Sequence, residues 1–506
     1  MKFLYEITLI LSSLLISNFA LADVSVGSNT KLESERLGHI GKCVDLSSFI
    51  RVSRSTDTVV IHSYNHEGNV NSTPFATIKI SEAGCFKFTE LGYYEIFFPE
   101  GNKKTNIAII NDNIAPNFQM GMVTHFGNLN ISNDVSRTVK LLNAAGVGWV
   151  RDELSWQNVE KNKGIFNFPE QYDNYINTLK TSGLKTTIVL DYGNSNYGGT
   201  TNISSSIEPF ANYAEQLVKK YGDYVTHWEV WNEPKPKQFG SKGWETYAKL
   251  LAQVYSKIKS LQQNSVVIGC GGGGAGGGPG GDCIKAVTKY YDNNIADAFS
   301  IHPYLTHSPE KGYSAFNSPF RGLGGYINIE SVTKMLKPVA EKKNKPIYIT
   351  EIGWPSSSDN KVFTDSLQAA FALRTYLLVR RDNFFPVVFW YDFRDDGNDK
   401  NNKEHNFGLL ENDYTPKMSY VAISNMNSLL NGYKWTKDIV YNQGVIVSEF
   451  HNGDKIIQVG WSHDNQIHQL LADARAGYVI DWQGKRVNSS NGNWVLSGMP
   501  SYRVLH

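Results

Sequence analysis

The sequence has almost no excess of charge of either sign, since 49 lysine and arginine side chains stand against 48 aspartate and glutamate side chains. A chain with a formal net charge of +1 creates no long-range field that would attract nucleic acid or an anionic membrane surface. After the first 22 residues the sequence also lacks any run of eighteen apolar residues. We therefore expect no nucleic-acid partner, no stable membrane insertion, and a neutral or weakly charged ligand.

The first 22 residues are the exception to this lack of long apolar runs. Lys2 precedes an apolar stretch, and the segment ends in Ala20-Leu21-Ala22, the small-residue pattern of a signal-peptidase site. We expect residues 1–22 to be a secretory signal peptide that is cleaved before Asp23, which predicts a secreted or periplasmic protein. An uncleaved membrane anchor is the alternative.

Cysteine is scarce, with only four in 506 residues. This small, even number fits disulfides formed in an oxidising compartment. Of the three pairings we favour Cys43 with Cys85 and Cys270 with Cys283, because each pair then lies within one expected domain. The second bridge would close the glycine-rich segment 271–282 and limit the entropy lost when that segment is ordered. A phosphate-binding loop is the alternative for this segment, but no Lys-Ser or Lys-Thr pair follows it.

Strand and helix patterns divide the remaining chain into three parts. Residues 23–112 contain short strands joined by turns, which predicts an N-terminal β-sandwich domain. Residues 432–506 have the same texture and predict a small C-terminal β domain. Between them, residues 113–431 alternate apolar strands with amphipathic helices, as parallel βαβ units do. Eight such units favour an α/β fold of the closed (β/α)8 TIM-barrel type over the alternative, an open doubly wound sheet.

Glutamates stand at the ends of two of the eight expected barrel strands, which lie near residues 118–124, 147–153, 185–191, 227–232, 266–270, 298–303, 347–351 and 387–392. Strand four leads into the sequence WNEP, which contains Glu233, and strand seven into TEIGWP, which contains Glu351. Working groups of such barrels lie at these carboxyl ends. A facing pair of carboxylates is what cleavage of a glycosidic bond requires. A separation of about 5 to 5.5 Å would give retention of configuration, and roughly 6.5 to 9.5 Å would give inversion.

The two motifs, in this order, resemble clan A of the retaining barrel glycoside hydrolases over about residues 117–431. The stretch 156–168, which includes Trp156 and Glu160, is most similar to glycoside hydrolase family 39 and related bacterial exopolysaccharide hydrolases, although neighbouring families share parts of it. In that clan the general acid/base follows strand four and the nucleophile ends strand seven. The resemblance therefore implies an acid/base at the glutamate of WNEP and a nucleophile at the glutamate of TEIGWP, with structural ion pairs as the alternative for both.

The resemblance also implies roles for five supporting side chains. Asn232 would bind the 2-hydroxyl of the sugar, and Arg151 would keep the nucleophile ionised. Tyr304 would donate a hydrogen bond to the nucleophile, and His302 would shape the same wall. Trp390 would form the floor under the reacting sugar. Core packing or an ordinary buried salt bridge is the alternative for each of them.

Three further side chains, His125, Asp191 and Asp392, also lie near strand ends and are candidates for sugar contacts, His125 above all. No metal or cofactor is expected, since no tight ligand spacing is visible and the segment 394–399 lacks the calcium-loop pattern. The function expected is retaining hydrolysis of a polysaccharide or oligosaccharide by a monomer, with Glu233 protonated in the free protein. An inactive polysaccharide-binding barrel is the first alternative, and an adhesion protein that uses only its β domains is the second.

Overall fold

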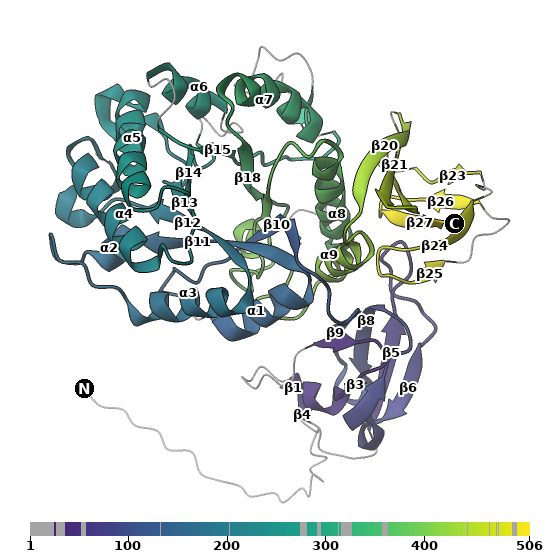
Figure 1. Cartoon of the computed structure of the whole chain (residues 1–506). Helices are drawn as coiled ribbons and strands as arrows, with labels where there is room; N and C mark the ends of the chain where they lie inside the picture. The colour runs from purple at the N-terminus through teal and green to yellow at the C-terminus, as the bar shows by residue number, and fades with distance from the viewer. Residues whose placement is uncertain are drawn as a thin grey trace, which may run out of the picture.

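A computed structural model describes most of the chain (Figure 1). The described residues are 25–26, 36–51, 57–131, 133–201, 203–273, 281–290, 295–311, 313–314, 326–356, 363–442, 444–464, 466–471, 473, 475–487 and 493–506. The expected signal peptide and residues 274–280 of the glycine-rich segment lie outside these ranges.

Eight parallel strands close into a barrel in the order β10-β11-β12-β13-β14-β15-β18-β19. Their bounds are Asn117–Val123, Val147–Ser155, Lys185–Asp191, His227–Val230, Val266–Gly269, Ala298–Ile301, Ile347–Ile352 and Val388–Trp390. Each strand pairs in parallel with the next, and β19 pairs with β10 to complete the cylinder. The expected (β/α)8 barrel is confirmed.

Helices surround these strands (Figure 1). In α4 (Ile207–Tyr221) the buried side chains, among them Phe210, Ala214 and Leu217, recur at helical spacing and face the barrel. Asparagine, aspartate or threonine side chains accept a backbone N–H at the start of α1, α7 and α8, which stabilises these helix ends. The remaining bounds are Val135–Ala144 for α1, Trp156–Val159 for α2, Glu170–Ser182 for α3, Trp244–Leu261 for α5, Gly281–Tyr290 for α6, Ile329–Lys343 for α7, Asp365–Asp382 for α8 and Met418–Leu429 for α9.

The inside of the barrel changes from apolar to polar along its axis. Trp149, Tyr348 and Phe389 belong to a buried apolar cluster inside the cylinder. Alternate residues of a strand share one face, so Arg151 follows Trp149 on the inner face of β11. Arg151 and the buried Glu229 of β13 then form a polar layer at the carboxyl end. This layer underlies the candidate site.

The N-terminal region contains a five-stranded sheet in the order β2-β9-β8-β5-β6. These strands are Leu37–His39, Lys103–Ile110, Gly92–Phe98, Thr58–Ser63 and Ala76–Lys79, and they cover a separate apolar core. Two short ribbons accompany the sheet, β1 (Ser25–Val26) with β4 (Ile50–Arg51) and β3 (Cys43–Val44) with β7 (Phe86–Lys87). The expected Cys43–Cys85 disulfide is confirmed next to the second ribbon.

The C-terminal region contains a six-stranded sheet in the order β20-β21-β22-β27-β24-β25 and the ribbon β23-β26. The sheet strands are Lys434–Tyr441, Val445–Asn452, Lys455–Ser462, Ser501–Leu505, Ala476–Ile480 and Arg486–Val487, and the ribbon strands are His468–Leu470 and Trp494–Leu496. The expected β structure on both sides of the barrel is thus confirmed. Among the described residues, none of the helices has the length and apolar character that a membrane span requires.

The C-terminal sheet contacts the barrel close to the candidate site. Arg374 on α8 donates to the carbonyl of Ser462 at 2.8 Å. Trp461 donates from its indole nitrogen to the Glu310 carboxylate at 2.7 Å, and Glu310 belongs to the segment that follows β15. That segment begins with His302 and Tyr304, so the C-terminal sheet helps to hold the backbone that carries two expected site residues.

Candidate active site

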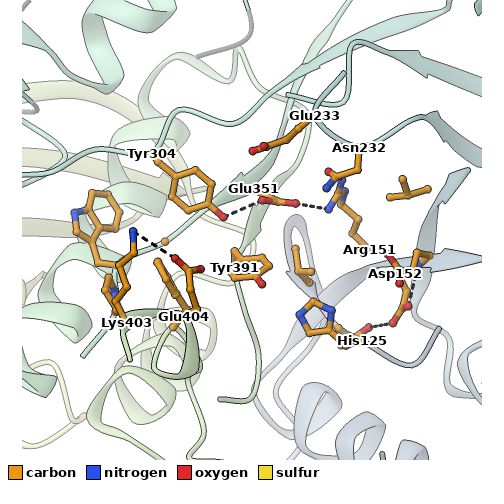
Figure 2. Close-up of a pocket in the computed structure, with 18 of the residues that line it drawn as sticks. His125, Arg151, Asp152, Asn232, Glu233, Tyr304, Glu351, Tyr391, Lys403 and Glu404 are labelled. Carbon is orange, nitrogen blue, oxygen red and sulfur yellow. Dashed lines mark hydrogen bonds and ion pairs between the residues drawn. The ribbon is translucent and has the colours of Figure 1, made fainter. Parts of the chain in front are cut away.

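A cavity of about 800 Å³ opens at the carboxyl ends of the barrel strands. Figure 2 shows Glu351 in its centre, with Tyr304 on one side, Arg151 on the other and Glu233 above. Seven of the residues expected from the sequence line the cavity, namely His125, Arg151, Asp191, Asn232, Glu233, Tyr304 and Glu351. His302 lies just behind them, and its side chain is only 1% exposed.

Trp390 is placed differently from the other expected residues. It does not line the cavity, and its ring is fully buried, with the indole nitrogen donating to the Phe407 carbonyl at 3.1 Å. The ring of Trp354 lies 5.8 Å away, centroid to centroid, and Trp354 does line the cavity. Trp354 is only 1% exposed, so its buried ring supports the cavity wall, with Trp390 packed behind it.

The backbone that carries Glu233 leaves regular strand geometry. β13 ends at Val230, and both Trp231 and Glu233 have positive φ, 72° and 45°. The Glu233 N–H donates to the Gly271 carbonyl at 2.7 Å. A Cβ atom at residue 271 would lie 2.0 Å from the Trp231 carbonyl oxygen, so glycine is required for this close approach. The first residue of the glycine-rich segment thus helps to aim Glu233 into the cavity.

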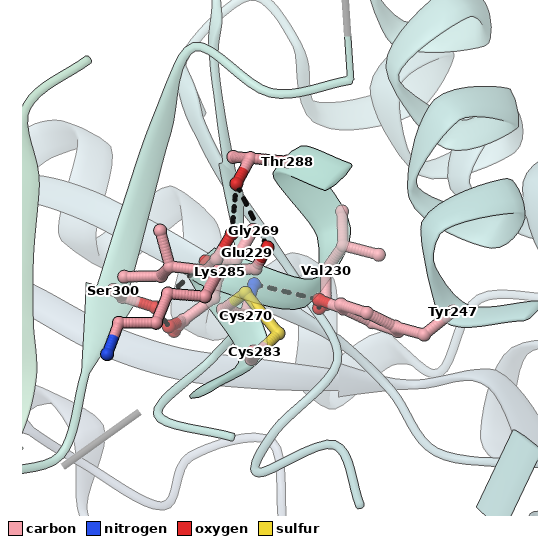
Figure 3. Close-up of a disulfide and its surroundings, with 10 residues drawn as sticks. Glu229, Val230, Tyr247, Gly269, Cys270, Cys283, Lys285, Thr288 and Ser300 are labelled. Carbon is pink, nitrogen blue, oxygen red and sulfur yellow. Dashed lines mark hydrogen bonds between the residues drawn. A yellow bond between two sulfur atoms is a disulfide. The ribbon is translucent and has the colours of Figure 1, made fainter. Parts of the chain in front are cut away.

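The Cys270–Cys283 disulfide lies next to residue 271 and holds the backbone that packs against residue 231. The expected pairing of these cysteines is confirmed (Figure 3). The Cys270 N–H donates to the Tyr247 hydroxyl at 2.8 Å, and that hydroxyl donates to the Val230 carbonyl at 2.8 Å. Helices α5 and α6 are thereby connected to the end of β13, where the segment that carries the acid/base candidate begins.

Glu351 is held on three sides inside β18. One carboxylate oxygen accepts a hydrogen bond from Arg151 Nη1 at 2.8 Å, and the other accepts one from the Tyr304 hydroxyl at 2.9 Å. His302 Nδ1 lies 3.3 Å from the second oxygen. The side chain is 9% exposed. Arg151 and Tyr304, which donate to the two different oxygens, fix the position of this carboxylate.

Glu229 is the functional residue that sequence reasoning missed. It is fully buried, and it accepts hydrogen bonds from Arg151 Nε at 2.6 Å, from Ser300 at 2.6 Å and from Thr350 at 2.8 Å. Burial alone would raise the pKa of Glu229, but the Arg151 charge and these bonds lower it. A charged residue inside an apolar strand was the available signal, because such a residue needs a buried partner.

Arg151 connects three residues of the site. Besides Glu229 and Glu351 it donates from Nη2 to Asn232 Oδ1 at 2.9 Å. Burial alone would lower the pKa of Arg151, but the charges of Glu229 and Glu351 outweigh it and raise this pKa. Asn232 in turn donates to the Tyr192 hydroxyl at 2.8 Å. The side chain that precedes Glu233 is therefore held from both ends.

Glu233 lies in more polar surroundings. Its side chain is 42% exposed, with His302 Nδ1 at 3.3 Å and Lys235 Nζ at 4.0 Å. The hydrogen bond with His302 is the main cause that lowers the pKa of Glu233, and the charges of His302, Lys235 and Arg151 act in the same direction. The sequence expectation was a protonated Glu233 in the free protein. The pKa of Glu233 is instead lowered, which favours the ionised form, because cationic side chains face this half-exposed carboxylate.

Hydrogen bonds around His302 determine which ring nitrogen carries a proton. The single hydroxyl proton of Thr350 is donated to Glu229 at 2.8 Å. His302 Nε2 lies 3.0 Å from the Thr350 oxygen, so this nitrogen must be the donor. In a neutral ring Nδ1 is then an acceptor, and it lies 3.3 Å from one oxygen of Glu233 and of Glu351. A neutral His302 can therefore accept the proton of Glu233 in a hydrogen bond, whereas the lowering of the Glu233 pKa described above requires an imidazolium, whose Nδ1–H donates to Glu233.

A second carboxylate pair, Glu153 and Asp191, lines the same cavity. Asp191 is 1% exposed, and neither of its carboxylate oxygens has a hydrogen-bond partner among the described residues. Burial, and then the charge of Glu153, raise the pKa of Asp191 well above its ordinary value. The protonated form of Asp191, which this shift favours, would be a hydrogen-bond donor in the cavity. The sequence singled out Asp191 by its position at a strand end, but not its pairing with Glu153.

Two groups of described side chains have the composition and spacing that could hold a metal ion. One contains Glu233, His302 and Glu351, which line or adjoin the main cavity. The other contains His125, Asp392 and Asp396 and lies behind the cavity wall. Asp392 is thus close to the site but does not line the main cavity.

These features define a class of protein. A closed (β/α)8 barrel carries two glutamates at the ends of its fourth and seventh strands, and one oxygen of each lies within 4.8 Å of the other. This is the architecture of the barrel glycoside hydrolases that cleave sugars with a pair of carboxylates.

Comparison with known families agrees with this class. The model of the family described as cellulase (glycosyl hydrolase family 5) matches residues 111–392, which is more than half of the chain. The chain belongs to this family. The matched residues contain both glutamates and all eight barrel strands.

Individual relatives extend the likeness to the flanking domains. A family 39 glycoside hydrolase from the gut symbiont Bacteroides cellulosilyticus WH2 has 29% identity and a TM-score of 0.78, over 96% of this chain and 100% of that one. A monomeric beta-xylosidase from Caulobacter crescentus CB15 shares the fold, with 15% identity and a TM-score of 0.52 over 76% of this chain and 95% of that one. Beta-glucosidase 25 from Oryza sativa subsp. japonica is 29% identical over 130 residues, 22% of this chain. The chain spans about a quarter of the length of the curated relatives that it matches.

Proposed function

We propose that this chain is a retaining glycoside hydrolase that cleaves O-glycosidic bonds of a polysaccharide or oligosaccharide by double displacement. The observation that carries the proposal is the short separation of Glu233 and Glu351, whose nearest oxygens lie within 4.8 Å of each other. Retaining enzymes hold their two carboxyl groups about 5 to 5.5 Å apart, whereas inverting enzymes need roughly 6.5 to 9.5 Å to admit a water molecule. The geometry therefore favours direct attack by a carboxylate.

In the first step Glu351 attacks the anomeric carbon while Glu233 donates its proton to the leaving glycosidic oxygen. Arg151 and Tyr304 support this role because each donates to one oxygen of Glu351, and together they fix its orientation. A bound sugar would cover the half-exposed Glu233 and weaken the influence of Lys235 on it. Both changes would raise the pKa of Glu233 and favour its protonated form. A neutral His302 stabilises the same form by accepting the proton in a hydrogen bond.

In the second step the ionised Glu233 takes a proton from water, and that water attacks the glycosyl ester on Glu351. Breaking the ester restores the carboxylate of Glu351, which Arg151 and Tyr304 again stabilise. The lowered pKa of Glu233 suits a group that must end the first step ionised. It also predicts that the enzyme works best on the acidic side of neutrality.

Other side chains of the cavity would hold the sugar. Asn232 would contact the hydroxyl next to the anomeric carbon, and His125 and Asp191 line the wall where further hydroxyls would lie. Trp354 and Trp390, both buried, would support this wall from behind rather than contact the sugar. Asp191, whose pKa is raised by burial, would in its protonated form donate a hydrogen bond to a sugar hydroxyl.

We extend the proposal to the whole chain. Residues 1–22 would be a signal peptide that directs the protein to a secreted or periplasmic location, where both disulfides are stable. Residues 23–112 and 432–506 would be separate β domains on a catalytic domain of residues 113–431. Trp461 and its bond to Glu310 support a bracing role for the C-terminal domain. The active form would be a monomer.

The test is the configuration of the first-formed product. A panel of neutral polysaccharides would be digested, the products identified by mass spectrometry, and the anomeric configuration followed by NMR before mutarotation. We expect a product with the same configuration as the substrate. An inverted product would contradict the double displacement, and cleavage of no panel member would contradict the hydrolase assignment. Glu351→Gln, prepared identically, controls for contaminating enzymes.

A further inference from the structure

Three side chains converge behind the wall of the catalytic cavity, at the ends of the first and last barrel strands. His125 follows β10, and Asp392 and Asp396 follow β19. His125 Nε2 lies 3.7 Å from Asp392 Oδ2 and 3.6 Å from Asp396 Oδ1. One atom from each of the three lies within 4.8 Å of the other two.

The distances of 3.6 and 3.7 Å are too long for hydrogen bonds. They are close to the separation of two atoms that bind the same cation. An N–H donor approaches a carboxylate to about 2.7 to 3.2 Å, so neither contact is a hydrogen bond. Two ligands of one cation with bonds of about 2.0 to 2.2 Å are separated by about 3 to 3.6 Å. The imidazole nitrogen and the two carboxylates therefore surround a position that an atom between them would fill.

Two polar atoms of this group, one on Asp392 and one on His125, lack hydrogen-bond partners among the described residues. Asp392 is 2% exposed, and its Oδ1 has no hydrogen-bond partner among the described residues, nor has His125 Nε2. The nearby ammonium of Lys417 lies 2.7 Å from Asp395 and is paired there. Burial, and then the charges of Asp396 and Asp395, raise the pKa of Asp392 well above its ordinary value. Arg394 also lines this space, but its guanidinium donates to Asn133 Oδ1 at 2.9 Å and to the Asn412 carbonyl at 3.4 Å.

A small cavity lies at the same place. Its volume is about 20 Å³, and its lining includes His125, Asp392 and Asp396 together with the side chains of Asn133 and Thr124. A space of this size holds a single water molecule or ion and no organic ligand. Asn133 Oδ1 accepts from Arg394 at 2.9 Å, and the Thr124 hydroxyl donates to Asp152, so His125 and the two aspartates are the ligand candidates. His125 lines both this cavity and the catalytic one.

We propose that His125 Nε2 and the carboxylates of Asp392 and Asp396 bind one divalent cation of the Zn²⁺ or Mn²⁺ class. Imidazole together with carboxylates suits these ions, whereas Ca²⁺ and Mg²⁺ prefer oxygen ligands alone. The ion would tie the end of β10 to the end of β19 and fix the face that His125 presents to the catalytic cavity. This inference revises the sequence expectation that the chain binds no metal.

The full chain, freed of metal by chelation, would be titrated with Zn²⁺, Mn²⁺ and Ca²⁺ by calorimetry, and with Co²⁺ by visible absorption. We expect one site per chain for Zn²⁺ or Mn²⁺, with a Co²⁺ spectrum that contains a nitrogen ligand. Asp396→Asn, which changes a partly exposed side chain, should weaken binding at least about tenfold, and Asp392→Asn with Asp396→Asn should abolish it. Asp399→Asn, in the exposed part of the same loop, should leave binding unchanged.

The group of Glu233, His302 and Glu351 is a rival cation site, and Glu351→Gln separates the two. Binding that persists in Glu351→Gln and is lost in the Asp396→Asn variant supports the proposal. Binding lost in Glu351→Gln and retained in Asp396→Asn overturns it, as does binding of Ca²⁺ alone or of no cation. Thermal denaturation of each variant without metal shows whether it is folded. None of these readouts uses sugar cleavage, so their outcome is independent of the proposed hydrolase activity.

Discussion

Glu351 and Glu233 face the same cavity from opposite sides, yet their surroundings differ in almost every respect. The side chain of Glu351 is 9% exposed, and that of Glu233 is 42% exposed. Glu351 lies within a regular strand, whereas Glu233 follows a strand end in a segment with positive φ. Arg151 and Tyr304 hold Glu351 by direct hydrogen bonds, while Glu233 has only His302 and the more distant Lys235.

The difference corresponds to the two tasks of a double displacement. A nucleophile has to be charged and fixed at one distance from the anomeric carbon, which needs rigid donors. An acid/base has to change its protonation twice in each cycle and exchange protons with water, which needs exposure and an adjustable partner. The predictions below test this contrast, beginning with the largest expected effect.

Replacement of the nucleophile should have the largest effect. Glu351→Gln keeps the shape of the side chain but removes the attacking charge, so kcat should fall on the order of 10⁴-fold or more. Steady-state kinetics on the substrate found by the polysaccharide panel measure this loss, and circular dichroism verifies the fold. Glu341→Gln, an exposed glutamate on α7, is the matched control. Near-normal turnover of Glu351→Gln would show that Glu351 is not the nucleophile.

Replacement of the acid/base should have a smaller effect that depends on the leaving group. Glu233→Gln should lower kcat about 10²- to 10⁴-fold on a natural glycoside, and far less on an aryl glycoside whose leaving group needs no proton. Azide sharpens the comparison, because it should rescue Glu233→Ala with a product of retained configuration and Glu351→Ala with an inverted one. The same azide product from both variants would contradict the division of roles.

Loss of one hydrogen-bond donor to Glu351 should have the third-largest effect on kcat. Tyr304→Phe removes a 2.9 Å hydrogen bond to a charged carboxylate. Such bonds contribute about 1.5 to 3 kcal/mol, so kcat should fall about 10- to 100-fold. The control is Tyr290→Phe, an exposed tyrosine on α6. A fall in affinity for substrate with unchanged kcat would instead assign Tyr304 to binding.

Much of this arrangement could be predicted from the sequence because it depends on local patterns. Alternating apolar strands and amphipathic helices fix a barrel, and a residue at the end of a barrel strand faces the mouth whatever the rest of the chain does. Glu233 and Glu351 were recognised in this way, and Arg151 through the resemblance to the clan. The two disulfides followed from the same division into domains.

The residues that were missed depend on contacts that no local pattern contains. Glu229 becomes part of the site through Arg151, which is 78 positions away and on another strand. Whether Trp354 or Trp390 lines the cavity depends on how two rings from adjacent strands pack. The lowered pKa of Glu233 results from the side chains of His302 and Lys235, and their distances could not be read from spacing.

A change one residue away from Glu351 tests the adjustable partner of Glu233. Thr350→Val removes the hydroxyl that fixes the proton on His302 Nε2. The proton can then move to Nδ1, where it donates to Glu233 and stabilises the ionised acid, so the alkaline limb of kcat/KM should shift to lower pH. The rate should fall on the order of tenfold. Thr350→Ser, which keeps the hydroxyl, should restore both values, and an unchanged alkaline limb in Thr350→Val would contradict the assigned tautomer.

The smallest effect should come from Lys235, whose ammonium lies 4.0 Å from a Glu233 oxygen while both side chains are about half exposed. The charge of Lys235 lowers the pKa of Glu233, and the acid is lost as pH rises through that pKa. Lys235→Met should therefore raise the pKa and move the alkaline limb of kcat/KM to higher pH, by about a few tenths of a pH unit because solvent screens the pair.

High salt should remove the difference between Lys235→Met and the unsubstituted enzyme, since it screens the lysine in the latter. Lys237→Met, an exposed lysine two residues further along, should leave the limb in place. A shift toward lower pH in Lys235→Met would mean that the limb reports a group other than Glu233. Glu233 would then not be the proton donor, and the difference in exposure between Glu233 and Glu351 would not correspond to the roles of acid/base and nucleophile.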